Sequence, residues 1–65
     1  MPKYIKLHLG DEVIYLNPEF IVGFESSEDM ETIMHLSHSY YSNNSKILIV
    51  KDDIHTICRM LDIEE

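Results

Sequence analysis

The chain opens on a regular alternation of apolar and polar residues, which predicts a half-buried β-strand over residues 4–9. The apolar positions of this alternation, which share one face of the strand, are Ile5, Leu7 and Leu9. The pair Gly10-Asp11 follows and favours a turn, because glycine adopts positive φ without steric cost. Apolar positions return at 13–16, so we expect residues 4–16 to form a β-hairpin.

An Asn-Pro pair at residues 17–18 ends this hairpin, because proline lacks the N–H that a strand ladder needs. A third strand is predicted over residues 20–24, where the apolar run is nearly continuous. Such a run indicates either burial on both faces or a bulge near Gly23. After a polar turn at 42–45, the β-branched residues of 47–50 predict another strand.

The stretch 30–41 is compatible with two structures. Its alternating positions, which favour a strand, are Thr32, Met34 and Leu36. The apolar spacing also fits a helix, which would begin at a capping box of Ser26 and Asp29. We adopt the strand; a helix here would produce a different sheet.

The last element is an amphipathic helix, predicted over residues 54–62. Its apolar stripe, spaced i, i+3, i+4 and i+7, consists of Ile54, Ile57, Cys58 and Leu61. Asp53 is placed as its N-cap, where a carboxylate accepts a backbone N–H and favours the positive end of the helix dipole.

Together these elements predict an α+β fold in a single small domain, residues 1–65. We expect a small antiparallel sheet of about five strands, open or curled, with one C-terminal helix. The nine isoleucines and three valines suit a pleated surface, and the absence of alanine argues against a helical bundle. The positions expected in the core are Leu7, Val22, Leu36, Ile49, Ile57 and Leu61.

Charge narrows the class of partner. Twelve acidic residues against five basic ones give a formal net charge of −7. Such a field repels nucleic-acid phosphates and anionic lipids, and the basic residues form no cluster. We therefore expect no direct nucleic-acid or membrane partner, and we favour a protein partner with a basic surface.

Cysteine content and apolar run length bear on the compartment. Cys58 is the only cysteine, so no internal disulfide forms, whereas small secreted domains usually depend on several. No apolar stretch approaches the roughly 20 residues that cross a bilayer, and residues 1–4 contain no signal-peptide core. A reducing cytoplasm is the expected location.

The residues that might support catalysis or metal binding do not form a recognisable site. His35 and His38 would point to opposite faces of a strand, and a zinc site needs about three or four ligands. Cys58 and His55 would be neighbours on a helix, yet Cys58 belongs to the apolar stripe and is expected to act as a small core residue. We expect no enzymatic activity, no metal and no cofactor.

Two segments are candidates for binding a partner. The first is acidic and contains Glu25, Glu28, Asp29 and Glu31; the second is the aromatic pair Tyr40 and Tyr41. The acidic segment can also be read as a solvated turn, and the tyrosines as cross-strand packing. A second sheet face would bring together Tyr4, Lys6, Tyr15 and Phe20. A homodimer would supply the burial which that face lacks.

Several segments resemble a known family. They are 5–10 (IKLHLG), 16–18 (LNP), 32–33 (TI) and 50–54 (VKDDI), and they resemble the small flagellar FlbD-like and swarming-motility SwrD-like proteins and related short phage or mobile-element proteins. The resemblance implies an antiparallel sheet, a C-terminal helix and no enzymatic activity. The chain differs from the family pattern at 37–45, where a long segment replaces a short Asn-Gly turn.

The leading hypothesis is a non-enzymatic protein-binding module that modulates a larger bacterial or phage assembly. One alternative is a phage-encoded acidic inhibitor of a host nucleic-acid enzyme or defence system, whose carboxylates occupy the place of phosphates. Another is a homo-oligomer that sequesters a small ligand.

Overall fold

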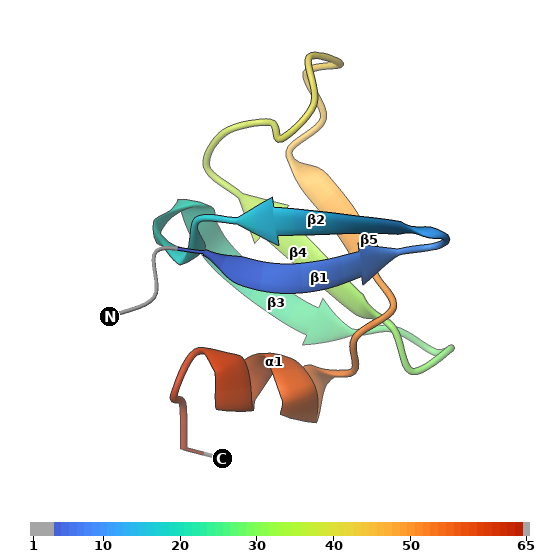
Figure 1. The fold of residues 1–65 in the computed structure, drawn as a ribbon, viewed down its shortest axis with the longest axis vertical. Coiled ribbons are helices and arrows are strands. Elements are labelled where there is room, and N and C mark those ends of the chain that lie inside the picture. Colours follow the sequence, from blue (N-terminus) through green and yellow to red (C-terminus); the bar gives the residue numbers. More distant parts are fainter. Residues whose placement is uncertain (1–3, 65) are drawn as a thin grey trace.

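The computed structural model describes residues 4–64, which form two antiparallel sheets and one short helix (Figure 1). The elements in chain order are β1 (Ile5–Leu9), β2 (Glu12–Leu16), the 3-10 helix η1 (Pro18–Phe20), β3 (Ile21–Ser26), β4 (Thr32–Leu36), β5 (Ile47–Val50) and α1 (Ile54–Met60). One sheet is the β1–β2 hairpin, and the other has the order β3–β4–β5. The predicted α+β class is confirmed, as is the strand within 30–41.

The N-terminal hairpin forms as the alternation predicts. Leu7 pairs with Ile14, and both side chains point into the core. Gly10 occupies the turn with a φ of 55°, a left-handed conformation that favours glycine. The strand β2 begins at Glu12, one residue before the expected start.

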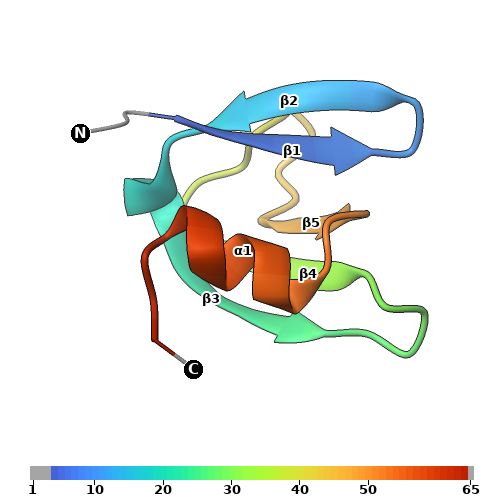
Figure 2. The same cartoon turned by 60° about the horizontal axis from the view of Figure 1, so that its bottom comes forward.

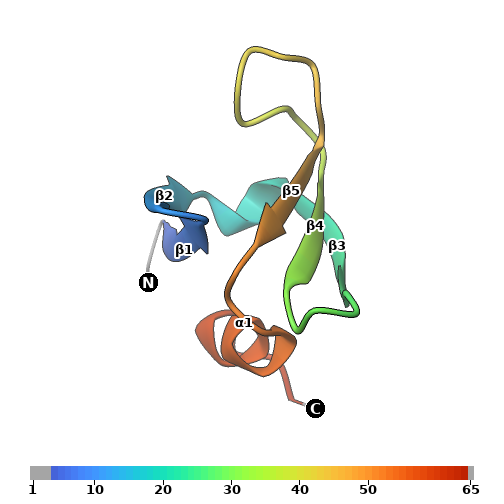
Figure 3. The ribbon, with the colours of Figure 1, turned by 90° about the vertical axis from the view of Figure 1, so that its right-hand side faces the viewer.

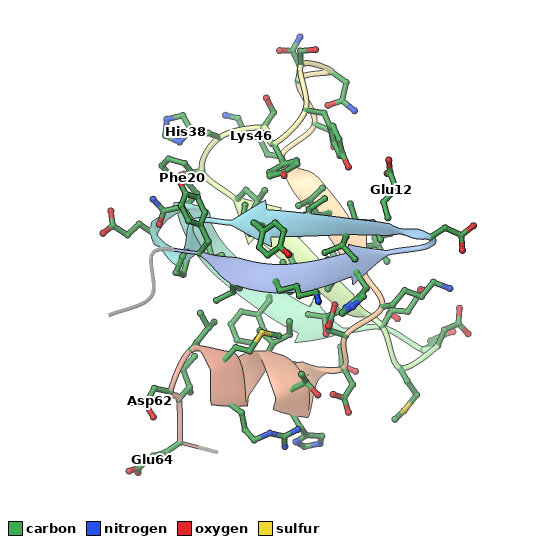
Figure 4. All side chains as sticks on the ribbon, viewed as in Figure 1. Glu12, Phe20, His38, Lys46, Asp62 and Glu64 are labelled. Atoms are coloured by element: carbon green, nitrogen blue, oxygen red, sulfur yellow. The ribbon has the colours of Figure 1, made fainter. Side chains whose placement is uncertain are left out.

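The break after the hairpin contains a structure that the sequence pattern did not indicate. Pro18 starts the 3-10 helix, and the side chain of Asn17 caps it by accepting the N–H of Glu19 at 2.9 Å. The ring of Phe20, in this helix, lies 5.0 Å from the ring of His38 (Figure 4). Phe20 was expected on a sheet face with Tyr15; that expectation was wrong, because the 3-10 helix separates Phe20 from the hairpin.

A bulge interrupts the pairing of β3 with β4. Ile21 is opposite Leu36, but Gly23 is opposite His35, so Val22 is an extra residue on β3. Val22 is therefore turned outward and is 73% exposed. Its predicted place in the core was wrong, and of the two interpretations of this apolar run the bulge is confirmed.

Period-2 alternation divides β4 and β5 between two faces. The inward side chains, all buried, are Thr32, Met34, Leu36, Leu48 and Val50. Ile49 pairs with Ile33 on the opposite face and is 53% exposed, so its predicted place in the core was also wrong. The reason is that residues 47–50 are all apolar, and composition does not say which face of such a strand is buried.

The core lies between the β1–β2 hairpin, the β3–β4–β5 sheet and the helix α1 (Figure 2). Asp53 caps it as predicted, its carboxylate accepting the N–H of Thr56 at 3.0 Å, but the helix ends at Met60 rather than at 62. Ile57 is fully buried, whereas Leu61 packs against the core while remaining partly exposed. The expected core positions Leu7, Leu36 and Ile57 are confirmed.

Candidate functional site: outer surfaces of the two sheets

The predicted acidic residues surround the turn between β3 and β4. Glu25 lies at the outward side of β3, where its side chain is 62% exposed and its Oε2 is 3.0 Å from Nε2 of His35. Glu28 and Asp29 are exposed in the turn itself. Glu31 is partly buried, and its carboxylate lies 3.8 Å from Nζ of Lys51. Three of the four residues are therefore exposed, and two of the four carboxylates, those of Glu25 and Glu31, contact a side chain within the chain.

The turn that presents Glu28 and Asp29 is held by hydrogen bonds around Ser27. The hydroxyl of Ser27 accepts the N–H groups of Asp29 at 3.3 Å and of Glu31 at 3.2 Å, and the N–H of Ser27 donates to the carbonyl of Glu31 at 2.8 Å. Met30 adopts a φ of 65°. These bonds fix the backbone from which the two exposed carboxylates project.

The predicted tyrosine pair lies at the opposite end of the β3–β4–β5 sheet, in the 37–46 loop (Figure 1). The rings of Tyr40 and Tyr41 meet edge to face, with their centroids 5.0 Å apart. Partial loss of hydration raises the pKa of Tyr41, and the carboxylate of Glu12 and the neighbouring Tyr40 add to this effect. The structure thus does not bring the tyrosines and the acidic turn into one site.

Sequence reasoning missed an uncovered apolar surface on the β3–β4–β5 sheet. The hairpin and α1 lie on one side of the β3–β4–β5 sheet, and none of the described elements covers the other side (Figure 3). We call this side the outer sheet face; its apolar residues are Val22, Ile33, Ile47 and Ile49. The uniformly apolar run at 47–50 was the signal, because an open sheet with one core leaves the second face of that strand uncovered.

The hairpin also has an exposed outer face. Tyr4, Val13 and Tyr15 are exposed there, and Tyr15 is opposite Lys6. Lys6 and Tyr15, which were predicted to share an uncovered surface, are directly opposite each other; Tyr4, predicted to join them, precedes β1 and is exposed. This face differs from the outer sheet face in carrying a lysine among its aromatic side chains.

A buried carboxylate joins the two sheets and the helix. Asp52, whose side chain is 8% exposed, accepts the backbone N–H of His8 at 2.7 Å and lies 2.9 Å from Nδ1 of the same residue. The carbonyl of His8 accepts the N–H of Lys51 at 2.7 Å, and the carbonyl of Asp52 accepts the hydroxyl of Thr32 at 2.7 Å. These contacts fix the hairpin relative to the three-stranded sheet.

The residues considered for catalysis and metal binding come from three places: His55 and Cys58 from α1, His35 from β4 and His38 from the loop after β4. Within residues 4–64, no three His, Cys, Asp or Glu side chains gather in a way that would hold a metal ion. Cys58 is buried at the edge of the core. No helix in this described part of the chain has the length and apolar character needed to span a membrane.

The chain was compared with protein-family models, with curated proteins and with solved structures, and none of them matches it. The resemblance to the FlbD-like and SwrD-like proteins therefore stays a prediction.

Proposed function

We propose that this chain is a non-enzymatic protein-binding module that modulates a larger bacterial or phage assembly through a partner with a basic surface. The observation that carries the proposal is the uncovered outer sheet face. Val22 and Ile49 expose 73% and 53% of their surface there, although the chain has only 65 residues with which to bury apolar area. Contiguous exposed apolar patches with polar rims mark interaction sites in soluble proteins.

Charge supports the choice of a basic partner. The net charge of −7 raises the encounter rate with basic surfaces and disfavours phosphate and anionic lipid surfaces. The exposed Glu28 and Asp29 extend this negative potential beside the apolar patch. The resemblance to flagellar and swarming-motility proteins supports the bacterial or phage setting, and the lone Cys58 supports a reducing cytoplasm as the location.

A capture experiment tests this function. The tagged chain is incubated with nuclease-treated bacterial lysate, and captured proteins are identified at low and high salt. We expect a stoichiometric protein that is retained at low salt and released at high salt, since screening shortens the reach of exposed charges from about 10 Å at 0.1 M to about 3 Å at 1 M. Absence of any stoichiometric protein at either salt concentration contradicts the proposal.

The acidic turn favours a second candidate function. Glu28 and Asp29 project into solvent from a hydrogen-bonded turn. Carboxylates presented in this way can bind the arginine and lysine side chains with which a nucleic-acid enzyme binds phosphates. The double charge reversal Glu28→Lys with Asp29→Lys separates the two functions. An inhibitor that mimics phosphates loses binding steeply, whereas a module that binds through the outer sheet face keeps most of it.

A further inference from the structure

We infer that the outer sheet face is the docking surface of this protein, and that the partner segment which covers it carries apolar side chains flanked by lysine or arginine. This inference rests on the proposed protein-binding function and specifies its surface and partner chemistry.

The apolar centre of the surface follows from strand register. Ile33 in the middle strand is opposite Ile49 on β5, and the next outward pair along the strands joins His35 to Ile47. The bulge adds Val22 at the β3 side. Because neighbouring strands lie about 4.8 Å apart, Ile33 and Ile49 form an apolar cross-strand pair, and Ile47 extends this apolar strip along β5. His35 lies between Ile47 and the β3 side that carries Val22.

An acidic rim borders this strip on the β3 side. Glu25 is opposite Ile33 in the register, so its carboxylate stands directly beside the apolar centre. Its Oε2 lies 3.0 Å from Nε2 of His35, and the Glu25 side chain remains 62% exposed. Lys51, the nearest lysine at this end of the sheet, lies 3.8 Å from Glu31 and is thereby partly neutralised. The unbalanced charge at the rim is negative, which suits a cationic side chain on the partner.

Charge also argues against a second copy of the chain as the occupant of the outer sheet face, and against the hairpin as the docking surface. A second copy of the chain would bring another net charge of −7 and another acidic rim against the first. The hairpin's outer face carries Lys6 opposite Tyr15 at its centre, whereas the centre of the outer sheet face carries Glu25 beside Ile33. On the outer sheet face, exposed apolar side chains and a carboxylate lie side by side.

The direct test is a titration of the isotope-labelled protein, followed by NMR amide shifts, with a short peptide of alternating valine and lysine. A peptide in which glutamate replaces lysine is the matched probe. We expect shifts at Val22, Ile33 and Ile49 with the lysine peptide, and at least about tenfold weaker binding of the glutamate peptide. Equal binding of both peptides, or shifts confined to the hairpin, overturns the inference.

Two variants sharpen the test. Glu25→Lys, on an exposed position, should reverse the preference between the two peptides, and Ile49→Lys should weaken the lysine peptide by about tenfold or more. The matched control Val13→Lys, on the hairpin, should change binding less than about twofold. Thermal unfolding of each variant establishes that it is folded. An unreversed preference in folded Glu25→Lys contradicts the acidic rim.

The lysate capture separates this inference from the function on which it rests. If the wild-type chain captures a partner that Ile49→Lys retains and Val13→Lys loses, the docking surface is wrong while the binding function stands. If the wild-type chain instead sediments as a dimer that Ile49→Lys dissociates, the occupant is a second copy and the inference fails. If wild type captures nothing, the proposed function itself fails.

Discussion

His8 and Asp52, 44 positions apart in the chain, are joined by two contacts of 2.7 and 2.9 Å that use both carboxylate oxygens. The first is donated by the backbone N–H of His8, and the second joins its ring Nδ1 to Asp52. Together with the bond from the Lys51 N–H to the His8 carbonyl, they lock the end of β1 against the connection between β5 and α1. The stability of the whole arrangement of layers should therefore depend on Asp52.

Asp52→Ala should reduce the free energy of unfolding by about 1–3 kcal/mol, because the N–H of His8 loses a charged acceptor whose side chain is only 8% exposed. Urea denaturation of the two proteins measures this loss. Asp29→Ala, at an exposed turn position, is the control and should change stability by less than about 0.5 kcal/mol. Equal effects of the two substitutions would contradict the structural role of Asp52.

The helix cap should make stability depend on pH. Hydrogen bonds from the side chain and the backbone N–H of Thr56 lower the pKa of Asp53 from its ordinary value of 3.8, and the charges of His55 and Arg59 act in the same direction. A lowered pKa means that the folded state favours the ionised carboxylate. The resulting stability is present above pH 3.8 and is lost as the pH falls through the lowered pKa.

Thermal melts of wild type and Asp53→Asn across this acidic range measure the effect, since asparagine keeps a cap acceptor but cannot ionise. The advantage of wild type should be present at neutral pH and should shrink on acidification. Thr56→Val, which removes the side-chain hydrogen bond, should reduce the advantage as well. A wild-type advantage that stays constant down to the lowest pH would argue against this origin.

The hairpin turn should tolerate a side chain poorly. Gly10→Ala places a Cβ on a backbone with a φ of 55°, which costs an L-residue about 1–2 kcal/mol. Gly23 provides the matched control, because it lacks the positive φ and a Cβ there meets nothing within 4 Å. Gly23→Ala should be neutral or stabilise by up to about 1 kcal/mol. Chemical denaturation of the two variants gives the comparison, and a larger loss at Gly23 would be inconsistent with the bulge described.

The two valines of the three-stranded sheet should differ in how much stability the same substitution costs. Val50→Thr buries a hydroxyl at a fully buried position and should cost about 1–3 kcal/mol. Val22→Thr keeps the β-branched shape on an exposed bulge and should change stability by less than about 0.5 kcal/mol. Denaturation midpoints test this pair. A large loss of stability in Val22→Thr would indicate that Val22 is buried, and Val22 would then not belong to the outer sheet face.

Local signals in the sequence were sufficient to predict the hairpin and the C-terminal helix. The alternation around Gly10 predicted the hairpin, and the apolar stripe after Asp53 predicted the helix and its cap. Both signals depend on residues that are close together in the sequence. Of the four acidic residues selected from the sequence, Glu25, Glu28 and Asp29 are exposed, and Glu31 is partly buried beside Lys51. The bulge remained one of two alternatives, because an apolar run at 20–24 has the same pattern in both.

The tertiary structure decided which apolar residues are buried. Leu48 and Ile49 are equally apolar neighbours, and only the position of the hairpin and α1 on one side of the sheet buries the first and leaves the second exposed. Tertiary structure also decided the role of Asp52. A charged residue is normally expected at the surface, but folding brings His8, 44 positions away, into contact with its carboxylate. A strand pattern defines two faces, and the choice between them is made by contacts between segments that are distant in sequence.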